Sequence, residues 1–408
     1  MYSNEYISAI TVRTVHVPVL KMLAKFSEVN LSKDRFRRNA IAFGADSKNT
    51  VACIMKDKSL CLISDNHGPL SDPESTMRFE SSISKLLKST KPDIAAVDLH
   101  PDYYSTVYGE KIAGEKGIPL LRIQHHHAHA ASCMAEHGLE ESLALVFDGT
   151  GYGTDGNLWG AELLHVNPKG FTRFATFAAA PLPGGDASVR EPLRQLFGRI
   201  FFSSCHGKPN LDSFCRVHGL KPDIAKVWLK QLEKNINCPK SHSAGRLFDS
   251  VSCLLGLAPK IAREAEAAIN LQKAAEACKD KPDALLMPFK SFEKDGLFLI
   301  DWSPLFSNNV INFSGMSPAR KNLLALSFHH SLANSAMRMI DFGTAKFATR
   351  NIVLSGGVFM NRYFLEILQG NIIKSKLKAF PHVRVPTNDC GISLGQAVIA
   401  ATSDLNNI

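Results

Sequence analysis

The feature that most constrains the fold is a strand–turn–strand unit that occurs twice in the chain. In the first copy, a polar turn separates the apolar runs at residues 40–45 and 50–55. In the second copy, the apolar run at 143–147 ends at Asp148, a glycine-rich turn follows, and residues 158–164 run back. Short apolar runs bounded by turn residues predict strands. Because each hairpin opens a segment of mixed strands and helices, the pattern predicts an internally duplicated α/β fold.

The segments around these hairpins predict the organisation of the whole chain. Residues 1–39 are expected to form an N-terminal extension and residues 40–145 a first α/β lobe. Residues 146–408 are expected to form a second α/β lobe. This second lobe contains a mostly helical insertion at about residues 186–345, where apolar side chains recur at helical spacing.

Apolar runs and helical spacing predict further elements on both sides of the insertion. The extension contains an amphipathic stretch at residues 17–26, which favours a surface helix over a transit peptide. The remaining elements are helices at 79–87, 323–339, 363–368 and 391–401 and strands at 94–98, 118–123, 352–354 and 383–385.

Composition excludes several classes of protein. The chain has 408 residues, 45% of them hydrophobic and 21% charged, so it is not a disordered chain, a fibrous repeat or a small disulfide scaffold. Its nine cysteines include no CxxC pair, which disfavours a zinc finger and favours reduced thiols in the cytoplasm. No apolar run is long enough to span a membrane, and the N-terminus lacks a signal-peptide pattern. The net charge of +9 permits an anionic ligand without identifying one.

A histidine cluster follows the strand predicted at 118–123. If a helix starts near His125, then His125 and His129 lie one turn apart on the same face of that helix. Two imidazoles in this arrangement can bind one metal ion. The alternative is a polar helix start in which the histidines cap the helix or face solvent. The pattern therefore predicts a metal site only if oxygen ligands lie nearby.

Two aspartates could supply those oxygen ligands. Asp148 ends an apolar strand before a glycine turn, and Asp389 lies between a predicted strand and the closing helix. Either one could instead be an ordinary turn or N-cap residue. Two imidazoles with two carboxylates suit iron or zinc and leave coordination positions open for a substrate. The sequence does not choose between the two metals.

Three glycine-rich segments could bring the backbone close to a phosphate. They lie at residues 148–153, 181–186 and 355–361, and each carries glycines at a predicted turn. Successive backbone N–H groups with little steric bulk can bind phosphate, although a single glycine loop is usually only a turn. Lys48 and Arg190, taken alone, are surface cations. These residues predict a nucleotide-binding α/β enzyme and no particular reaction.

Longer strings identify a family. They lie at residues 44–50, 98–103, 124–129, 148–153, 183–186, 190–192, 245–249, 354–363, 388–389 and 391–396. In these strings the chain closely resembles the C-terminal carbamoyl-transfer region of the hydrogenase-maturation carbamoyltransferases, the HypF family. They cover about residues 40 to 400 in the expected order, so no single loop carries the match.

The resemblance implies a duplicated, actin-like (ribonuclease-H-like) ATP-binding fold, shared with the tRNA threonylcarbamoyl transferases and the antibiotic O-carbamoyltransferases. The cofactors it implies are ATP or carbamoyl-adenylate and one divalent metal, iron or zinc, with magnesium as a further option. Carried over residue by residue, the metal ligands are His125, His129, Asp148 and Asp389.

The same resemblance implies the residues that contact the nucleotide and the reacting group. Those expected to bind the nucleotide are Gly149, Thr150, Gly151, Asp186, Gly356, Gly357 and Asn361. Lys48, Arg190 and Asp249 are the catalytic candidates. Lys48 is expected to face phosphate or the reactive group, while Arg190 and Asp249, together with Asp186, hold the ribose or the carbamoyl end.

The implied reaction is transfer of a carbamoyl group from carbamoyl-adenylate to the C-terminal cysteine of a partner, a hydrogenase-maturation dehydratase. The product becomes the cyanide ligand of a nickel–iron hydrogenase. Because the partner supplies the nucleophile, none of the nine cysteines has to be catalytic. A separate source of carbamoyl-adenylate is expected, and no membrane. Nucleic acid is disfavoured as a partner, because no basic helix or aromatic–basic interleaving occurs.

The chain departs from the family pattern in several places. Full-length members carry an acylphosphatase domain, paired CxxC zinc fingers and an adenylate-forming domain before this region, so a truncated form is expected. Ala265 and Glu266 stand where the family usually has Gly and Gln, and Cys390 stands where glycine is usual. Two alternatives stay open. One is a catalytically impaired, nucleotide-binding homologue that acts as a maturation partner, and the other is a carbamoyl or threonylcarbamoyl transferase for another acceptor.

Overall fold

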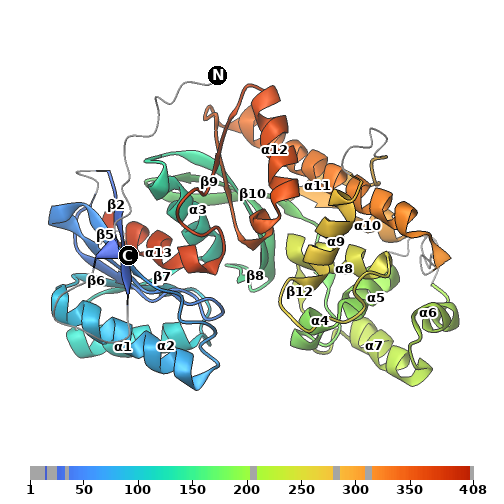
Figure 1. The fold of residues 1–408 in the computed structure, drawn as a ribbon, viewed down its shortest axis with the longest axis horizontal. Coiled ribbons are helices and arrows are strands. Elements are labelled where there is room, and N and C mark those ends of the chain that lie inside the picture. The colour runs from blue at the N-terminus through green and yellow to red at the C-terminus, as the bar shows by residue number, and fades with distance from the viewer. Residues whose placement is uncertain are drawn as a thin grey trace.

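The chain forms two mixed β-sheets with helices between them and on both outer sides (Figure 1). The computed structural model describes residues 14–15, 25–32, 36–202, 209–278, 285–307 and 315–404. The amphipathic stretch predicted at 17–26 lies outside the described residues except for its last two, of which Phe26 begins a strand. Among the described helices, none is long and apolar enough to cross a membrane.

The first sheet has seven strands in the order β1-β2-β5-β4-β3-β6-β7. They span Thr14–Val15 (β1), Phe26–Asn30 (β2), Ala40–Ala42 (β3), Ala52–Met55 (β4), Leu60–Ser64 (β5), Ile94–Asp98 (β6) and Leu120–Ile123 (β7). The hairpin predicted at residues 40–55 is β3 and β4, which pair antiparallel.

The second sheet has the main order β13-β14-β10-β9-β8-β15-β16. These strands span Ser142–Tyr152 (β8), Leu158–Asn167 (β9), Gly170–Phe177 (β10), Lys290–Lys294 (β13), Leu297–Asp301 (β14), Asn351–Ser355 (β15) and Lys378–Pro381 (β16). Two short strands, β11 (Ala180–Pro181) and β12 (Lys240–Ser241), pair beside this path.

The strand orders confirm the predicted duplication. In the first sheet, β5, β4 and β3 pair antiparallel, and β6 and β7 then add parallel to β3. In the second sheet, β10, β9 and β8 pair antiparallel, and β15 and β16 then add parallel to β8. Each half therefore has the strand order 3-2-1-4-5 of a ribonuclease-H-like unit, and the fold class is the duplicated α/β fold that was expected.

The helices cover the sheets in layers (Figure 1). Their bounds are Pro73–Ser89 (α1), Tyr104–Lys116 (α2), His125–Glu136 (α3), Asp186–Arg190 (α4), Pro192–Phe202 (α5), Leu211–His218 (α6), Pro222–Lys234 (α7), Ala244–Leu254 (α8), Glu266–Glu276 (α9), Ser303–Phe306 (α10), Pro318–Lys346 (α11), Arg362–Lys374 (α12) and Ile392–Thr402 (α13). The 3-10 turns span Lys56–Lys58 (η1), Gly357–Met360 (η3) and Asp389–Gly391 (η4). Between β11 and β15 the described chain is mostly helical, as predicted.

Alternation along the strands explains the layers. In β3, Ile41 packs with α1 and α2 on the outer face, while Ala40 and Ala42 face α3 and α13. In β8, Leu143 packs with the outer helices of the second half, while Ala144 packs against α3. Helices α3 and α13 therefore form a middle layer between the two sheets.

The middle layer is close-packed because its facing residues are small. A side chain at Gly395 of α13 would place its Cβ 1.8 Å from the carbonyl oxygen of Ala128 in α3. The two backbones therefore meet directly, which only glycine permits at this position. This contact fixes α13 relative to the helix that carries the histidines.

Three details differ from the sequence-based expectation. Strand β2 lies within the predicted extension, yet it pairs antiparallel with β5 and so belongs to the first sheet. Helix α13 belongs by sequence to the second lobe, but it packs on β3, β4 and β6 of the first sheet. The prediction of a strand at residues 383–385 is wrong. The strand in this part of the chain is β16, and the N–H groups of Val383 and Arg384 donate hydrogen bonds to the Glu136 carboxylate.

Candidate metal centre and glycine loops

Helix α3 starts at His125, as the sequence predicted. Its N-cap is Gln124, whose side-chain oxygen accepts a hydrogen bond from the His127 N–H at 2.9 Å. From this start, His125 and His129 lie one turn apart with their rings 5.1 Å apart. Both rings are buried, with exposed fractions of 1% and 0%. The solvated or capping alternative for these histidines is therefore wrong.

Asp148 reaches the histidines from the middle of β8. The Gly357 N–H donates to its Oδ1 at 3.0 Å, so its Oδ2 is the oxygen that faces the rings. Gly356 makes this approach possible, because it has φ +99° and a Cβ there would lie 2.3 Å from the Phe147 carbonyl oxygen. The glycine-rich segment at residues 355–361 thus orients a candidate ligand.

Asp389 approaches from the first residue of η4. Ser47, in the β3–β4 turn, donates a hydrogen bond to its Oδ2 at 2.5 Å, which leaves Oδ1 facing the rings. Thr50 of the same turn lies 2.8 Å from the Cys390 carbonyl oxygen. The first hairpin therefore positions the second carboxylate, although the two lie far apart in the sequence.

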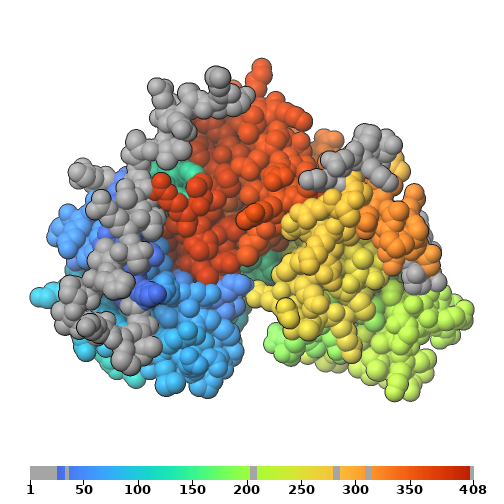
Figure 2. All heavy atoms as spheres, in the orientation of Figure 1, coloured from blue at the N-terminus to red at the C-terminus, as the bar shows by residue number. Residues whose placement is uncertain are grey.

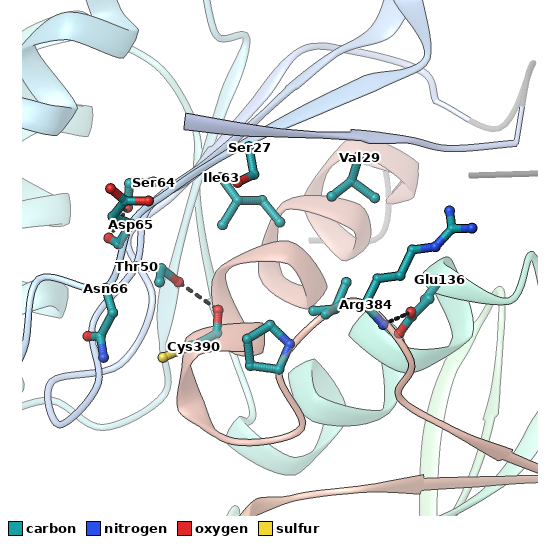
Figure 3. Close-up of a pocket in the computed structure, with 12 residues that line it drawn as sticks. Ser27, Val29, Thr50, Ile63, Ser64, Asp65, Asn66, Glu136, Arg384 and Cys390 are labelled. Carbon is teal, nitrogen blue, oxygen red and sulfur yellow. Dashed lines mark hydrogen bonds between the residues drawn. The ribbon is translucent and has the colours of Figure 1, made fainter. Parts of the chain in front are cut away.

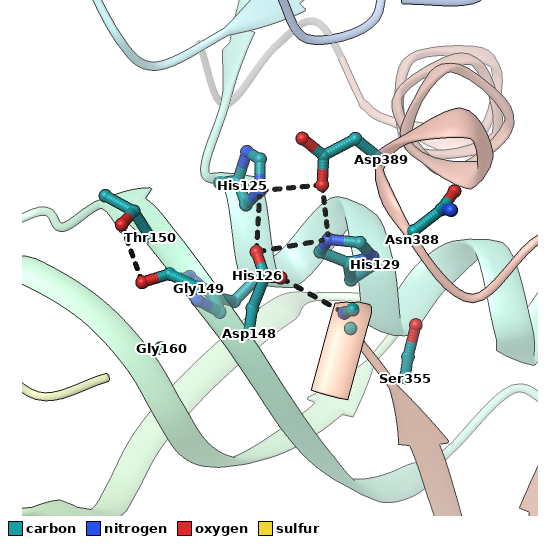
Figure 4. A network of polar contacts seen from close by, with 12 residues as sticks. His125, His126, His129, Asp148, Gly149, Thr150, Gly160, Ser355, Asn388 and Asp389 are labelled. Carbon is teal, nitrogen blue, oxygen red and sulfur yellow. Dashed lines mark hydrogen bonds and ion pairs between the residues drawn. The ribbon is translucent and has the colours of Figure 1, made fainter. Parts of the chain in front are cut away.

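The four ligand atoms form a compact set (Figure 4). Distances from the two Nε2 atoms to Asp148 Oδ2 are 3.4 and 3.7 Å, and those to Asp389 Oδ1 are 3.9 and 3.6 Å. Ligands at usual zinc distances in a tetrahedron lie about 3.4 Å from one another. Both Nε2 atoms are buried without a hydrogen-bond partner among the described residues. These geometric features fit a divalent metal.

Asp98 orients one of the two imidazoles. It ends β6, is fully buried, and lies 2.8 Å from His125 Nδ1 through its Oδ2. Its Oδ1 accepts from the His100 N–H at 3.0 Å, which holds the carboxylate in place. A proton on Nδ1 leaves the Nε2 lone pair directed at the carboxylates of Asp148 and Asp389. This is the arrangement by which a carboxylate fixes the tautomer of a metal-binding histidine.

The histidines and aspartates of this site carry opposite charges that stabilise one another. Burial lowers the pKa of His125, but the charges of Asp98, Asp148 and Asp389 outweigh it and hold this pKa well above its usual range. Burial raises the pKa of Asp148, yet its contacts with the two histidines hold it well below its usual range. A bound cation would take the place of these ring protons.

The glycine-rich turn after Asp148 lies beside this site, but its residues differ in role. A Cβ at Gly151 would lie 2.4 Å from the His126 ring, so this glycine lets β8 pack against α3. Thr150 is exposed, and its hydroxyl donates to the Gly149 carbonyl oxygen at 2.6 Å. Gly149 is bordered by the guanidinium of Arg246. Gly149 and Thr150 are thus the residues of this turn that a ligand could reach.

Lys48 lies at the site, where it pairs with a carboxylate from the other half of the molecule. Its Nζ is 2.5 Å from Glu264 Oε1. Burial lowers the pKa of Lys48, but Glu264, Asp389 and Asp148 together raise it. Figure 2 shows the molecule hollowed between the blue first half and the yellow helical region, with the two surfaces meeting below the red C-terminal segments. The Lys48–Glu264 ion pair joins the β3–β4 turn to the segment before α9.

The remaining predicted residues lie in the helical region or at its border. Asp186 and Arg190 are exposed at the two ends of α4. Asp249 is buried in α8, and its Oδ2 lies 3.1 Å from Arg246 Nη2. Asn361 caps α12 through the Phe364 N–H, and its amide nitrogen lies 2.9 Å from His329 Nε2. Both polar ends of Asn361 are therefore used within the protein.

Several residues at the site were not predicted as functional. They are Ser47, Asp98, Arg246 and Glu264, each of which contacts a predicted residue. The first three lie inside strings that carry the family resemblance, and that membership was the available signal. Glu264 directly precedes Ala265 and Glu266, where the chain departs from the family pattern.

A cavity of about 280 Å³ borders the loop that leads to Asp389, where Pro386 and Cys390 belong to its lining (Figure 3). Its described lining consists of Ser27, Val29, Thr50, Ile63, Ser64, Asp65, Asn66, Glu136, Arg384, Val385, Pro386 and Cys390. None of the predicted site residues is in this lining, so the cavity is distinct from the candidate metal centre.

Fold and site together define a class: a duplicated ribonuclease-H-like α/β protein with a buried two-imidazole, two-carboxylate site where its halves meet. Family models agree. Residues 35–136 match the "HypF Kae1-like domain", and residues 144–396 match the "Carbamoyltransferase, Kae1-like Domain, second subdomain". The chain therefore belongs to the HypF carbamoyltransferase family and corresponds to its Kae1-like domain, as the resemblance implied.

Individual relatives differ in length. A "Carbamoyltransferase HypF homolog" of Cupriavidus necator is 33% identical over 88% of this chain and 91% of its own length. The "Carbamoyltransferase HypF" of Rhodobacter capsulatus is also 33% identical, but the chain spans only 46% of it.

Solved structures agree with these matches. A full-length HypF in a phosphate- and nucleotide-bound form superposes with a TM-score of 0.80 at 30% identity, covering 91% of this chain and 58% of that one. The HypF of T. kodakarensis gives 0.75 at 30% identity, with coverages of 89% and 48%. The chain thus spans about half the length of several relatives.

Proposed function

We propose that this chain transfers a carbamoyl group from carbamoyl-adenylate to the C-terminal cysteine of a partner protein in hydrogenase maturation. The observation that carries the proposal is the set of four ligand atoms, three of them on buried residues and two of them unpartnered imidazole nitrogens, in a chain of the HypF family. The Gly149 turn and the Lys48 cation lie beside that set. The donor is an anionic mixed anhydride, which the Lys48 cation would attract.

The proposed reaction is an acyl substitution. The partner's thiolate sulfur attacks the carbamoyl carbon, a C–S bond forms, the C–O bond to the adenylate phosphate breaks, and AMP leaves with the electron pair. No oxidant or reductant is needed. His125, His129, Asp148 and Asp389 would hold a divalent metal, which would supply Lewis acidity toward a carbonyl or phosphate oxygen.

The chain's own residues would position the reactants. Lys48, once released from Glu264, places a cation where negative charge develops on the reacting group. Gly149 and Thr150 offer backbone N–H groups to the nucleotide. Gly357 acts through Asp148, which it orients by its N–H. The nucleotide-binding roles expected of Asp186, Gly151, Gly356 and Asn361, and the ribose or carbamoyl roles of Arg190 and Asp249, remain part of this proposal.

Metal content is the first test. Purified protein should hold about one metal ion per chain, and His129→Ala should lose it, because that change removes one of four ligands. Elemental analysis identifies the metal as iron, zinc or magnesium. His137→Ala is the control, since His137 lies at the other end of α3 and binds the Pro381 carbonyl oxygen. Equal metal content in wild type and His129→Ala would refute the ligand assignment.

Transfer is the second test. The protein is supplied with carbamoyl-adenylate and a peptide that ends in cysteine. The peptide should become about 43 Da heavier, because one carbamoyl group replaces the thiol proton. Mass spectrometry of the peptide measures this. Nucleotide binding without product would support the impaired homologue instead. A product formed on a hydroxyl or a tRNA base in place of the thiol would support another acceptor.

A further inference from the structure

Helix α8 begins against the backbone of the Asp148–Gly149 turn. The Ser243 hydroxyl, at its N-cap, lies 2.8 Å from the Asp148 carbonyl oxygen and 2.6 Å from that of Gly149. A Cβ at Gly245 would lie 2.8 Å from the Gly149 Cα, so the two backbones are in contact. The first turn of a helix carries partial positive charge, and here that charge faces the glycine turn beside the metal ligands.

Arg246, in this first turn, has a guanidinium that is buried and only partly paired. The residue is 9% exposed, and its Nη2 lies 3.1 Å from Asp249 Oδ2. Its Nε and Nη1 are buried without a hydrogen-bond partner among the described residues. Nη2 also lies 3.6 Å from the point where a Cβ on Gly149 would be. Buried donors without acceptors are costly, so their presence here points to an acceptor that comes from outside the chain.

The surrounding charges favour an anion as that acceptor. Asp249 is already held by Gln195, whose amide nitrogen lies 3.1 Å from the same Oδ2, and burial raises the pKa of this carboxyl group. Arg199 is buried nearby with its Nε donating to the Ser250 hydroxyl at 3.0 Å. Asp249 therefore faces two guanidinium groups, of which Arg199 also interacts with Asp301. A guanidinium fork beside a helix N-terminus and a glycine turn matches the geometry of a phosphate group.

We propose that Arg246 is a phosphate-binding residue that holds a phosphate oxyanion over the Gly149 turn. The inference rests on the proposed function in one respect, namely that the natural source of this phosphate is the adenylate. It assigns a phosphate contact to a residue outside the predicted set, in which Lys48 was the side chain expected to face phosphate or the reactive group. Inorganic phosphate carries the same chemistry and is the second possible source.

The experiment compares three probes on the metal-loaded protein by calorimetric titration: AMP, adenosine and inorganic phosphate. Arg246→Gln should weaken AMP binding about ten- to a hundredfold, which is the usual effect of losing hydrogen bonds to a charged group. Adenosine has no phosphate, so its affinity should stay within about twofold. Inorganic phosphate should lose affinity together with AMP. Arg246→Lys, which keeps the charge without the fork, should fall between the two proteins.

A second variant guards against loss of folding. Gly149→Ala keeps Arg246 and adds a methyl group 3.6 Å from Nη2, at a position where no backbone strain opposes it. It should also weaken AMP more than adenosine. Arg216→Gln is the matched control, since it removes an exposed arginine of α6 that has no proposed role and should leave AMP binding unchanged. Thermal unfolding of each variant verifies that it is folded.

The possible outcomes separate this inference from the proposed function. Equal AMP affinity in wild type and Arg246→Gln would overturn the phosphate role and leave the transferase proposal standing. An equal loss for AMP and adenosine would also overturn it, because a structural defect affects both ligands. If the wild type binds inorganic phosphate through Arg246 but neither AMP nor adenosine, then the phosphate site stands and the adenylate-dependent function fails.

Discussion

At the scale of single residues, the candidate metal centre depends on a second set of hydrogen-bonding groups, two side chains and one backbone N–H, behind the ligands. Ser47 holds Asp389, Gly357 holds Asp148, and Asp98 holds His125. His129 has no such partner among the described residues, since both of its ring nitrogens are unpaired. The two imidazoles are therefore positioned unequally, and the contribution of His125 depends on Asp98.

Replacement of Asp98 by Asn tests that dependence. The amide keeps the size of the side chain but no longer accepts the Nδ1 proton as a charged group, so we expect metal affinity to fall about 10- to 100-fold. Competition with a coloured chelator measures this affinity. Asp102→Asn, an exposed aspartate in the same string, is the control and should have wild-type affinity. Unchanged affinity in Asp98→Asn would contradict the orienting role.

A strained residue gives a prediction about stability. Ala265 precedes α9 with φ +59°, a left-handed conformation that costs an L-residue about 1–2 kcal/mol. Ala265→Gly removes this strain and adds some entropy to the unfolded chain, so the free energy of unfolding should rise by about 0.5–1 kcal/mol. Urea denaturation measures it. Ala268→Gly, inside α9, should have the opposite sign, and a loss of stability in Ala265→Gly would refute the strain argument.

Some residues of the metal site could be predicted from the sequence and others could not. The spacing of His125 and His129 and the strand-end position of Asp148 are local patterns, and the structure brings these residues together as expected. Asp98 and Arg246 could not be predicted as functional from local pattern, because an aspartate at a strand end and an arginine in a helix have many ordinary roles. Their importance depends on partners that are distant in the sequence. Asp98 contacts His125, which is 27 residues away, and Arg246 lies beside Gly149, which is further away still.

At the scale of elements, the end of α3 anchors the loop that leads to Asp389. Glu136, the last residue of α3, accepts hydrogen bonds from the Val383 and Arg384 N–H groups at 3.1 and 2.5 Å, and its Oε2 lies 3.1 Å from His382 Nδ1. Burial raises the pKa of Glu136, but these donors outweigh burial and bring it below its usual value of 4.5. The charged form is therefore the one that holds the loop.

Glu136→Gln should reveal this as a pH-dependent loss of stability. A carboxyl group whose pKa is lowered by folding stabilises the protein above its unfolded pKa, and this contribution disappears as the pH falls through the folded pKa. We expect the variant to be less stable by about 1–3 kcal/mol near pH 7, with the difference shrinking below about pH 4.5. Urea denaturation at several pH values measures this difference.

The matched control is Glu141→Gln, because the Glu141 carboxylate lies 2.7 Å from His165 Nε2 but is half exposed. An exposed pair of this kind contributes little. A stability difference for Glu136→Gln that grew on acidification would contradict the assignment.

Most elements could be predicted, and the failures have physical reasons. The hairpins, the start of α3 and the closing helix follow from apolar runs and turn residues that are local in the chain. The strand at 383–385 was wrong because Val-Arg-Val has strand composition, while long-range hydrogen bonds to Glu136 decide its conformation. The place of α13 on the first sheet is likewise a tertiary outcome, which depends on the small residues of both surfaces.

At the scale of the whole molecule, the ligands come from parts of the chain that only the complete fold brings together. The histidines lie in the middle layer, Asp148 in the second sheet, and Asp389 in a loop tied by Ser47 to the first sheet. A metal bound only by the folded state stabilises it by mass action. The domain boundaries at residues 39 and 145 remain a proposal, since the middle layer belongs to both halves.

Metal removal should therefore destabilise the entire molecule. At free metal a hundred times above its dissociation constant, the stabilisation is about 2.7 kcal/mol, and a chelator should abolish it. Thermal unfolding with and without chelator measures the change. His129→Ala should unfold at the same temperature in both conditions. If the wild type unfolded at the same temperature with and without chelator, no metal would stabilise the fold.

The ion pair between Lys48 and Glu264 has a consequence for how tightly any anion can be held. A ligand that reaches Lys48 must first displace a carboxylate that the chain itself supplies, so Glu264 acts as an internal competitor. The measured affinity of the ligand then reflects the difference between two attractions to Lys48, that of the ligand and that of Glu264. Glu264 is 69% exposed, and exposed pairs are worth only about 0–1 kcal/mol, so the competition is mild and reversible. The arrangement favours multiply charged anions, which out-compete a single carboxylate, over singly charged metabolites of similar size.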